Sequence, residues 1–341
     1  MTRFRTVFAT AAVGVVALTL AACSSGTPAD EEGPATGGDS SAFPLTISSA
    51  LGDAVIESAP TRVATWGWGA TDAVIALGIV PVAIPSDDYS GGEDRISPWI
   101  EEALDDLGGE APAILDNSSF ELKVEELLAA DPDVLIAPYS GLTQEEFDEI
   151  TGAGIPVVAY AEGPWVTPWR DVVTITGEAL GMDAEAEVIL EGLDARLAEA
   201  AAAHPEFAGT SISVPSDSGG IWYLYLPADP RVEILEDLGF VSPASVTDLD
   251  SGESTFYTTV SPESLDRIDS EVVLTFVDDG GLDAFTASTT AQLIPAVKKG
   301  AVAALVNGPE VSALTPTPLT LPWILPTLTE RLAAATAIAQ G

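Results

Sequence analysis

The sequence has few of the residues that most often bind metals and nucleic acids. It contains one cysteine and one histidine in 341 residues, so the chain cannot form an intramolecular disulfide or build a cage of His and Cys ligands for a metal. Basic residues are also scarce, because 12 Lys and Arg stand against 53 Asp and Glu, a formal net charge of −41. Such a surface repels phosphate backbones, which argues against nucleic acid as a partner. It also disfavours strongly anionic ligands unless a local basic residue compensates.

The sequence also lacks a hydrophobic run long enough to span a bilayer as a stable helix. Its N-terminal run, Val7 to Leu20, is too short. The next residues, Leu20-Ala21-Ala22-Cys23, resemble the bacterial lipobox, in which the signal peptide is cut before the cysteine and the thiol is acylated. We therefore expect residues 1–22 to be a lipoprotein signal peptide and Cys23 to carry a lipid anchor; a plain secretory signal is the alternative. Residues 23–42 are rich in Gly, Ser and Pro and are expected to be a flexible tether.

Beyond the tether, short apolar segments alternate with amphipathic ones. The expected strands are residues 62–66, 80–84, 134–137 and 157–159 in the first half, and residues 211–214, 222–226, 272–276 and 302–305 in the second. Most of them are followed by a segment with helical periodicity. This alternation predicts an α/β fold whose sheets are mostly parallel and are covered by helices.

One uninterrupted helix is expected between the two alternating regions, at residues 183–204. Its apolar positions are Ala186, Leu190, Leu193, Leu197 and Ala200. Spacings of four, three, four and three are the period of a helix with one apolar stripe. Pro205 ends this helix, because the residue before a proline is pushed out of helical geometry.

An internal match indicates that the two halves are related. Glu125, Leu127, Asp131, Asp133 and Val134 recur as Glu263, Leu265, Asp269, Glu271 and Val272, each 138 residues later (263 − 125, 272 − 134). Both copies have the pattern of a helix, an acidic turn and an apolar strand. A chance match is the alternative, since such units are common. We predict two Rossmann-like lobes, residues 43–182 and 205–341, joined by the single long helix at residues 183–204.

Large aromatic residues gather at the expected strand ends and in the loops that follow. In an open parallel sheet, ligands bind outside these carboxyl ends. Two facing sets of rings, one per lobe, would line a cleft for an organic ligand, here called the cargo. The expected cargo-binding rings are Trp66, Trp68, Tyr89, Tyr139, Trp165, Trp222, Tyr225 and Tyr257, with Tyr223 and Phe256 in the same region. For each ring, packing in a core is the alternative.

Arg170 is one of ten basic residues outside the signal peptide (12 − 2). It falls in the first turn of an expected helix, where the helix dipole disfavours a cation. This position indicates an acidic partner, which is either an oxygen of the cargo or a carboxylate of the protein. We include Arg170 among the cargo-binding candidates.

Three patterns that could indicate an enzyme are incomplete. Residues 66–70 (WGWGA) follow a strand as a dinucleotide fingerprint would, but Asp72 stands where a third glycine is needed. Residues 217–220 (DSGG) are similar to a serine-protease loop, but the one histidine, His204, lies close upstream. Carboxylate pairs are abundant, yet nothing singles out two of them. We expect no catalysis; a lipid-anchored hydrolase that uses cleft carboxylates and an adhesion protein are the alternatives.

Several segments resemble, in order, the class III substrate-binding lipoproteins of ABC transporters, the iron-siderophore and vitamin B12 type. They are residues 43–47 (FPLTI), 60–64 (PTRVA), 131–136 (DPDVLI), 180–181 (LG), 261–265 (SPESL) and 295–300 (PAVKKG). Residues 67–72 (GWGATD) and 138–143 (PYSGLT) look like its actinobacterial siderophore-binding branch. The resemblance covers nearly all of residues 43–339.

This resemblance implies cargo held between two lobes and delivered to an ABC permease and its ATPase. It implies docking on the permease through one carboxylate per lobe. We assign these roles to Glu145 and Asp283, which the internal offset relates, with Glu146 and Asp279 as alternatives. Iron would arrive wrapped in its chelator, so no cofactor and no metal ligand of the protein is expected. The protein would be a monomer, lipid-anchored at the extracytoplasmic face of the cell membrane.

The scarcity of basic residues also bears on the kind of cargo. Members of this family that bind highly anionic catecholate complexes usually line the cleft with several Arg or Lys. Here Arg170 stands nearly alone among the cleft candidates. We therefore expect a neutral or cationic ferric complex, such as a hydroxamate siderophore, with haem or cobalamin as the alternative cargo of the same fold.

Overall fold

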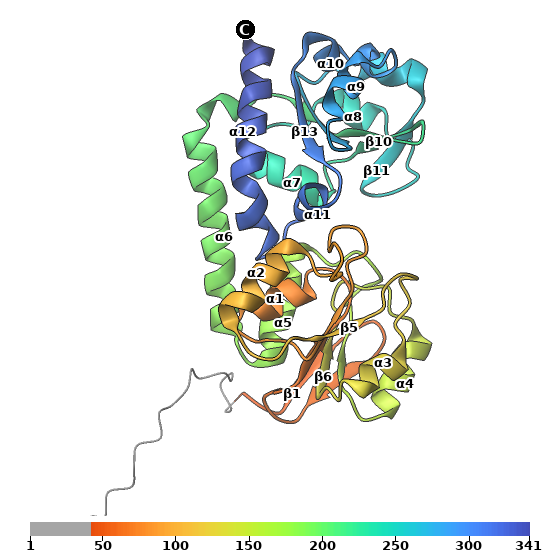
Figure 1. Cartoon of the computed structure of the whole chain (residues 1–341), viewed down its shortest axis with the longest axis vertical. Coiled ribbons are helices and arrows are strands. Elements are labelled where there is room, and N and C mark those ends of the chain that lie inside the picture. Colours follow the sequence, from red (N-terminus) through yellow and green to blue (C-terminus); the bar gives the residue numbers. More distant parts are fainter. Residues whose placement is uncertain (1–41) are drawn as a thin grey trace, which may run out of the picture. The chain divides into compact units, whose positions relative to one another are not determined.

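The computed structural model describes residues 42–341 (Figure 1). The expected signal peptide, Cys23 and nearly all of the expected tether lie outside the described residues. In the N-terminal part the elements are β1 (Leu45–Ser48), β2 (Asp53–Ile56), β3 (Val63–Thr65), α1 (Ala70–Ala76), β4 (Ala83–Pro85), α2 (Pro98–Leu107), β5 (Ala113–Leu115), α3 (Val124–Ala129), β6 (Val134–Ile136), α4 (Gln144–Gly152), β7 (Val157–Val158) and α5 (Trp169–Leu180).

The second part begins with α6 (Asp183–Ala203), the expected connecting helix. It is followed by η1 (Pro205–Phe207), β8 (Ile212–Ser213), β9 (Pro215–Ser218), β10 (Ile221–Tyr225), α7 (Pro230–Asp237), α8 (Ala244–Asp248), β11 (Tyr257–Val260), η2 (Pro262–Arg267), β12 (Val272–Val277), α9 (Leu282–Ala287), η3 (Ala291–Leu293), α10 (Pro295–Lys299), β13 (Val302–Val306), α11 (Pro309–Ala313) and α12 (Thr320–Gln340). Between residues 42 and 341, no helix is both long enough and apolar enough to cross a membrane.

The part of the chain from β1 to α5, here called the N-terminal lobe, contains a five-stranded parallel sheet in the order β5-β4-β3-β6-β7. Except for the buried Thr65 of β3, its strands are apolar, because both faces of the sheet are covered. Successive side chains alternate between the faces: Val63 and Val134 pack with α1, α5 and the β1–β2 hairpin, whereas Ala64 and Leu135 pack with α3 and α4. The predicted parallel α/β arrangement is therefore confirmed in this lobe.

The part of the chain from η1 to α12, here called the C-terminal lobe, contains two three-stranded sheets. One is parallel, in the order β13-β12-β8. The other is antiparallel, in the order β11-β10-β9. The sequence had indicated β10 as a strand but not its antiparallel pairing, because periodicity identifies a strand and not its neighbour. This second sheet becomes one wall of the candidate site.

The two parallel sheets share an order and an anchoring device. The order β3-β6-β7 in the first lobe corresponds to β8-β12-β13 in the second. Asp133, just before β6, accepts hydrogen bonds from Thr61 N at 2.7 Å and Arg62 N at 3.1 Å. Glu271 occupies the place 138 residues later (271 − 133), just before β12, and accepts from Ser211 N at 2.9 Å. In each lobe an acid therefore ties the central strand to the strand beside it, which fits an internal duplication.

The connecting helix α6 buries the predicted stripe and lies close to α5. Ala186, Leu193 and Leu197 are buried. Gly177 of α5 permits the close contact, because a Cβ at that position would lie 2.5 Å from the Cβ of Ala186. The helix is therefore held to the N-terminal lobe along one face.

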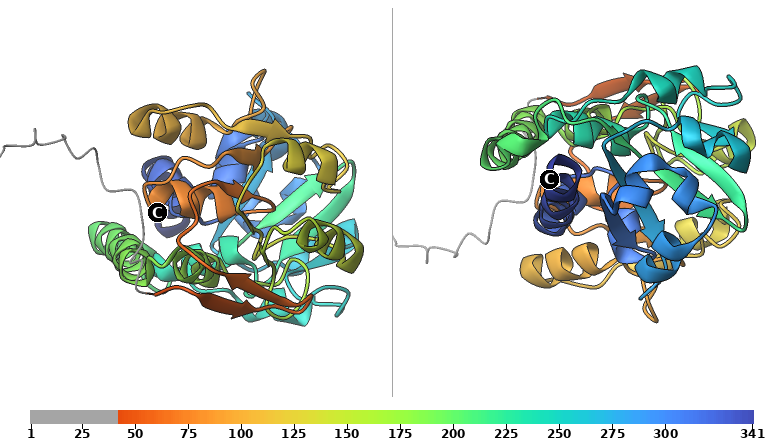
Figure 2. Two further views of the ribbon diagram at one scale, coloured as in Figure 1. Left: turned by 90° about the horizontal axis from the view of Figure 1, so that it is seen from below. Right: turned by 90° about the horizontal axis from the view of Figure 1, so that it is seen from above.

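A second long helix, α12, packs against elements of both lobes beside the predicted joining helix. It runs beside α6 (Figure 1, Figure 2), and both helices contribute to one apolar cluster that includes residues of α1, α2 and α5. The rings of Trp99 in α2 and Trp323 in α12 meet edge to face, with centroids 5.6 Å apart. The chain thus crosses once through α6, while packing with α12 continues the core from lobe to lobe.

Candidate functional site

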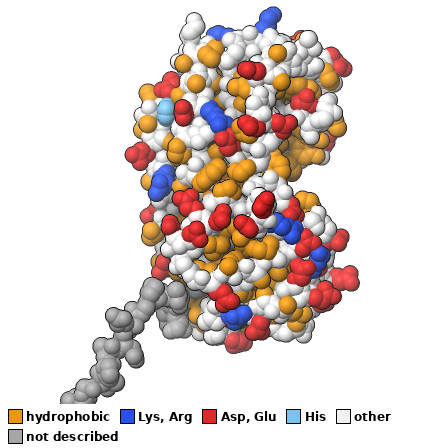
Figure 3. Space-filling view, in the orientation of Figure 1, with side chains coloured by type: hydrophobic (Ala, Val, Ile, Leu, Met, Phe, Trp, Pro, Cys, Tyr) orange, Lys and Arg blue, Asp and Glu red, His pale blue; other side chains and the backbone are white. Residues whose placement is uncertain are grey.

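A cavity of about 1020 Å³ lies between the two lobes. Figure 3 shows the surface hollowed between them, with hydrophobic side chains on both walls. The N-terminal lobe lines the cavity with the loops that follow β3, β4 and β5, and the C-terminal lobe lines it with β9, β10, α7 and α11. This volume is at the upper end of the usual range for small-molecule sites, so the cavity suits a large organic ligand.

Trp68 on the N-terminal wall is positioned by a glycine turn. Gly67 has a φ of 83°, and a Cβ there would lie 2.3 Å from the carbonyl oxygen of Tyr139. Only glycine fits such a close approach. The Trp68 N–H consequently donates to that oxygen at 2.9 Å, which ties the loop after β3 to the loop after β6.

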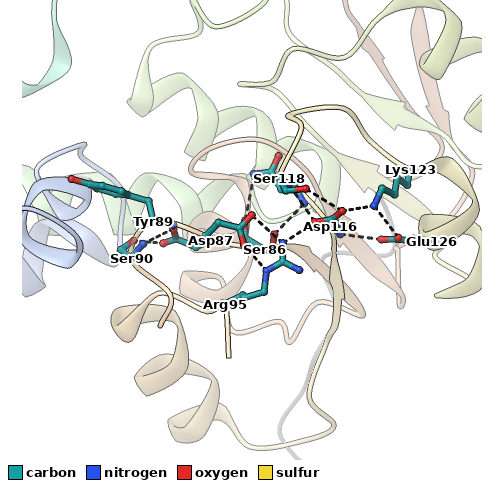
Figure 4. A network of polar contacts seen from close by, with 11 residues as sticks. Ser86, Asp87, Tyr89, Ser90, Arg95, Asp116, Ser118, Lys123 and Glu126 are labelled. Carbon is teal, nitrogen blue, oxygen red and sulfur yellow. Dashed lines mark hydrogen bonds and ion pairs between the residues drawn. The ribbon is translucent and has the colours of Figure 1, made fainter. Parts of the chain in front are cut away.

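Ion pairs hold two loops of the N-terminal wall against each other: the β4 loop, residues 86–97, and the β5 loop, residues 116–123 (Figure 4). Arg95 Nη2 donates to Asp116 at 2.7 Å, and Lys123 pairs with the same carboxylate. Hydrogen bonds from Lys123 and Arg95 hold the pKa of Asp116 far below its usual range. Asp116 therefore stays ionised, and its ion pairs connect the two loops.

Tyr89 lies on the β4 loop, which Asp87 braces from within. The Asp87 carboxylate accepts from Tyr89 N at 3.0 Å, Ser90 N at 2.8 Å and Ser97 Oγ at 2.6 Å (Figure 4). The Tyr89 hydroxyl then donates to Asn307 Oδ1 of the C-terminal lobe at 3.2 Å. This hydrogen bond connects the β4 loop to the loop after β13, and both residues line the cavity.

On the C-terminal wall, β10 divides its residues between core and cavity because side chains alternate along a strand. Trp222 and Leu224 face the core, whereas Tyr223 and Tyr225 line the cavity. Antiparallel pairing sets Tyr257 of β11 opposite Tyr225. The sheet register therefore places three tyrosine rings on one surface.

Arg231, in the first turn of α7, is the basic residue of the cavity wall. Its guanidinium donates twice to Asp229, at 2.8 and 2.6 Å, and lies 3.9 Å from the centroid of the Tyr225 ring. Burial lowers the pKa of Arg231, but the hydrogen bond and charge of Asp229 outweigh burial and raise it. Asp229 is only 1% exposed. The pair fixes a permanently charged, planar group that can donate to oxygen atoms of a ligand.

Asp72 of α1 lies at the floor of the cavity, where the lobes meet. It is 5% exposed, and Thr317 of the C-terminal lobe donates to it at 2.6 Å. Burial raises the pKa of Asp72 to about 6, although Thr317, the Asp72 backbone and Trp99 act in the opposite direction. The Trp99 indole is close enough to lower this pKa, but its N–H makes no hydrogen bond to the described residues. The floor thus combines a carboxyl that titrates near neutral pH with an unpaired buried donor.

Four of the predicted cargo-binding residues line the cavity: Trp68, Tyr89, Tyr225 and Tyr257. Tyr139 instead lines a small adjoining pocket together with Trp68. Burial raises the pKa of Tyr139, the charge of Asp229 adds to the rise and that of Arg231 opposes it. Pro230 and Pro318 line the same small pocket, so Tyr139 faces the C-terminal lobe. Trp165 lies behind it, with its ring edge to face and 5.7 Å away.

Two predicted cargo-binding tryptophans lie in hydrophobic cores instead. Trp66 is 2% exposed and packs among residues of β6, α3 and α4. Trp222 is 3% exposed and packs against β11, β12 and α10. Each ring lies on the face of its strand, or of the strand end, that helices or other strands cover. The expectation that they line the cleft is therefore corrected.

Arg170 also lies away from the cavity. It donates to Asp194 of α6 at 2.9 Å, and to Glu233 at 2.5 Å and Asp237 at 3.2 Å, both in α7. Its partners are therefore carboxylates of the protein, one of the two possibilities that the sequence had left open. Arg170 thus links α5, α6 and α7. The cavity wall, where Arg170 was expected, instead contains Arg231.

Arg231 and Phe120 are among the cavity residues that did not emerge from the sequence. Arg231 had a usable signal, because it stands in the first turn of an expected helix just as Arg170 does. Phe120 lies in a loop after β5, a strand that was not predicted. No pattern in the sequence marked its ring as exposed.

Comparison with known proteins agrees with this architecture. The family model for periplasmic binding proteins matches residues 63–307. The chain belongs to this family. The family that the motifs had indicated is thereby confirmed, and its members are extracytoplasmic solute-binding proteins rather than enzymes. No curated protein matches the chain significantly by sequence.

Solved structures similar to this periplasmic binding protein include siderophore complexes. PiaA of Streptococcus pneumoniae, in complex with ferrichrome, has 33% identity and a TM-score of 0.76 over 86% of this chain and 99% of that chain. A periplasmic solute binding protein of Mycobacterium smegmatis has 24% identity and a TM-score of 0.71, over 86% and 98%. Staphylococcus aureus SirA, complexed with staphyloferrin B, has 21% identity and a TM-score of 0.66, over 84% and 98%. At their lower identity, the last two support the fold alone.

The expected docking carboxylates lie on the surface of this periplasmic binding protein. Glu145 is exposed in the first turn of α4, and Asp283 is exposed in the first turn of α9. The neighbouring Glu146 has another role, because its carboxylate accepts from Thr143 N at 2.7 Å and Leu122 N at 3.0 Å. Within residues 42–341, no group of three or more His, Cys, Asp or Glu side chains could hold a metal ion.

Proposed function

We propose that this periplasmic binding protein captures a ferric siderophore of the hydroxamate type and delivers it to an ABC permease. The observation that carries the proposal is the cavity of about 1020 Å³ walled by aromatic rings of both lobes, with Arg231 on one wall. Ferric siderophores are compact complexes with apolar arms and an oxygen-rich centre. Rings can cover the arms, and the guanidinium can donate to the oxygens around iron.

The charge of the walls favours a neutral or cationic complex. Arg231 is the one basic side chain among the described residues that line the cavity, and Asp229 already neutralises it. The lining also includes Asp87, Asp88 and Asp217. A tris-catecholate ferric complex carries several negative charges, which this wall would repel. Ferrichrome, the ligand of the PiaA complex, belongs to the hydroxamate class that we favour here.

The test is a tryptophan-fluorescence titration against ferrichrome, ferrioxamine B, a ferric tris-catecholate, haem and cobalamin. Trp68 and the cavity tyrosines are close enough to the site for ferric complexes to quench the signal. Saturable quenching by at least one hydroxamate, and weak quenching by the catecholate, is the expected result. Tight binding of the catecholate with no response to hydroxamates would overturn the cargo class. Preference for haem or cobalamin would select the alternative cargo.

Delivery would use Glu145 and Asp283 as the docking contacts, one on each lobe. Support comes from their exposure in the first turns of helices that follow β6 and β12, the related central strands. Glu145→Lys combined with Asp283→Lys should abolish uptake of the cargo while leaving its binding in solution unchanged. Glu149→Lys with Glu330→Lys, also exposed acids, is the matched control. Intact uptake by the first double variant would remove the assignment.

The remaining parts of the proposal concern the place of action. Cleavage before Cys23 and acylation of its thiol would anchor a monomer at the extracytoplasmic face of the cell membrane, and residues 23–42 would tether the folded part. The chain would use no cofactor and catalyse no reaction. Cys23→Ala should release the protein from the membrane fraction, and mass spectrometry of the wild-type N-terminus should find the lipid. A wild-type N-terminus that carries no lipid would contradict the anchor.

A further inference from the structure

Left-handed backbone conformations concentrate on the cavity side of the N-terminal lobe. Within residues 42–341, four residues other than glycine have positive φ: Arg95, Phe120, Asp131 and Trp165. Three of them, all except Asp131, lie in loops after β4, β5 and β7, at the carboxyl edge of the sheet. A bulky side chain in this conformation costs free energy and persists only where the surroundings enforce it. Such strain gathers at ligand-binding sites, so these loops deserve a functional explanation.

Two features of Phe120 cost free energy. Its φ is 59°, and its ring is 66% exposed, the highest exposure of any aromatic residue in the described part of the chain. The ring does not stabilise a hydrophobic core, because it belongs to none of the buried clusters of residues 42–341. The ring instead lines the cavity between the lobes.

Hydrogen bonds hold the β5 loop in place on both sides of Phe120. Before it, Asn117 N donates to Ser86 Oγ at 3.0 Å, and Asp116 N donates to Glu126 at 2.9 Å. After it, Leu122 N donates to Glu146 at 3.0 Å. The Phe120 N–H closes the turn on the carbonyl of Asn117 at 3.1 Å. With both ends fixed, the turn can hold the strained conformation.

The ion pairs of Figure 4 extend this bracing to the neighbouring loop. Arg95 of the β4 loop donates to Asp116 of the β5 loop at 2.7 Å and to Asp88 of its own loop at 3.0 Å. The β4 loop carries Tyr89, which also lines the cavity and is largely exposed. One ionic network therefore sets the positions of two exposed rings, Tyr89 and Phe120, at the edge of the same cavity.

We propose that Phe120 is a specificity-determining cargo contact whose strained, exposed position is maintained by the Arg95–Asp116 ion pair. The inference rests on the proposed function. Cargo with an aliphatic flank would cover the ring and recover the free energy that its exposure costs. The geometry of the loop exists in advance, so binding does not have to order it. Arg95 is a positioning residue in this arrangement and touches no cargo itself.

The first experiment compares Phe120→Gly with Phe120→Leu by fluorescence titration with ferrichrome and ferrioxamine B and by thermal unfolding of the unliganded protein. Glycine removes the ring and relieves the left-handed strain, so affinity should fall roughly tenfold while Tm stays equal or rises. Leucine keeps an apolar side chain and should stay within about threefold of the wild type. A ring with a merely structural role would lower Tm when removed.

Unchanged affinity in Phe120→Gly would overturn the inference, as would a loss of affinity accompanied by a lower Tm. Failure of the proposed function has a different outcome, because the wild-type protein itself would then bind neither hydroxamate. The two failures are therefore separable in one set of titrations.

The second experiment is a double-mutant cycle between Arg95→Met and Phe120→Gly. If Arg95 acts through the position of the ring, its substitution should weaken binding in the wild-type background and have almost no effect when residue 120 is glycine. Arg95→Lys should restore part of the affinity by keeping the pair with Asp116. Additive effects of the two changes would show that Arg95 acts by another route and would overturn its positioning role.

Discussion

The two lobes share a central architecture but position their ligand-facing rings by different means. In the C-terminal lobe, the three tyrosines that line the cavity lie on β10 and β11, and the register of an antiparallel sheet aligns them. In the N-terminal lobe, the rings of Trp68, Tyr89 and Phe120 lie on loops. A glycine turn, ion pairs and left-handed backbone hold those loops. A related core can therefore support either a rigid wall or a set of individually braced rings.

The difference indicates which lobe tolerates change. Alternation along β10 is enforced by every ladder hydrogen bond, so one substitution there leaves the other rings in place. Each loop of the N-terminal lobe depends on a few polar contacts, such as the pair between Arg95 and Asp116. We expect these loops to determine which cargo is preferred. We expect the C-terminal wall to contribute most of the binding free energy that all cargoes share. Substitutions in each lobe, compared for their effects on stability and cargo affinity, test this difference.

The largest effect is expected for the C-terminal wall, from Arg231→Met. Asp229 would remain buried without its partner, which costs about 3 to 5 kcal/mol of unfolding free energy. The cargo would also lose its guanidinium donor. Urea unfolding and fluorescence titration measure the two consequences.

The control for this prediction is Arg231→Met combined with Asp229→Asn. Asparagine can still cap α7, where Asp229 now accepts from Arg231 N at 2.9 Å, and it carries no charge. Stability should largely return while affinity stays low. If affinity returned with stability, Arg231 would have only a structural role.

A smaller effect is expected where the lobes meet, from Asp72→Asn. The folded-state pKa of Asp72 is raised to about 6 from 3.8, so folding takes up a proton between these pH values. The stability that Asp72 contributes is therefore present below about pH 4 and is lost as the pH rises to about 6. At pH 7 the buried charge costs at most about 3 kcal/mol.

Asparagine removes this charge and can still accept the hydrogen bond of Thr317. The variant should thus gain stability relative to the wild type at pH 7.5 but not at pH 3.5. The measurement is the unfolding free energy of the variant minus that of the wild type at each pH. The other titrating groups are the same in both proteins, so their contributions cancel. An equal gain at both pH values would mean that Asp72 does not titrate in this range.

The paired anchors Asp133 and Glu271 allow a direct comparison of the lobes. Asp133 accepts from Thr61 N, Thr61 Oγ1 and Arg62 N, whereas Glu271 accepts from the backbone and hydroxyl of Ser211. Each change to alanine should cost about 1 to 2 kcal/mol, with the larger loss for Asp133 because it makes more bonds. Thermal unfolding of both variants measures the order. A reversed order would indicate that the anchors are not equivalent.

The smallest effect is expected from Arg170→Gln, on the surface between α5, α6 and α7. Exposed ion pairs contribute little, so the loss should stay below about 1 kcal/mol. Cargo affinity should not change, because Arg170 lies outside the cavity lining. Titration of this variant beside Arg231→Met compares the two first-turn arginines. A loss of affinity in Arg170→Gln would return it to the cargo-binding candidates.

The sequence by itself determined the family and most elements of the parallel sheets. Short apolar runs located every strand of these sheets except β5, and a period of 3.6 residues located the stripe of α6, because burial acts on every residue of such a run or stripe. The spacing of 138 residues predicted related halves, and Asp133 and Glu271 make corresponding hydrogen bonds in the two lobes. Local patterns suffice for these conclusions.

The tertiary structure alone decided which side chains face the cavity. Trp222 and Tyr225 stand on opposite faces of one strand, so they could not both line it, but which face is covered depends on distant residues of β12 and α10. Arg170 and Arg231 have the same local setting and differ in what packs against them. The floor joins Asp72 to Thr317, far apart in the chain. The residues that cover a side chain come from other elements, and a local sequence pattern does not show which elements pack together.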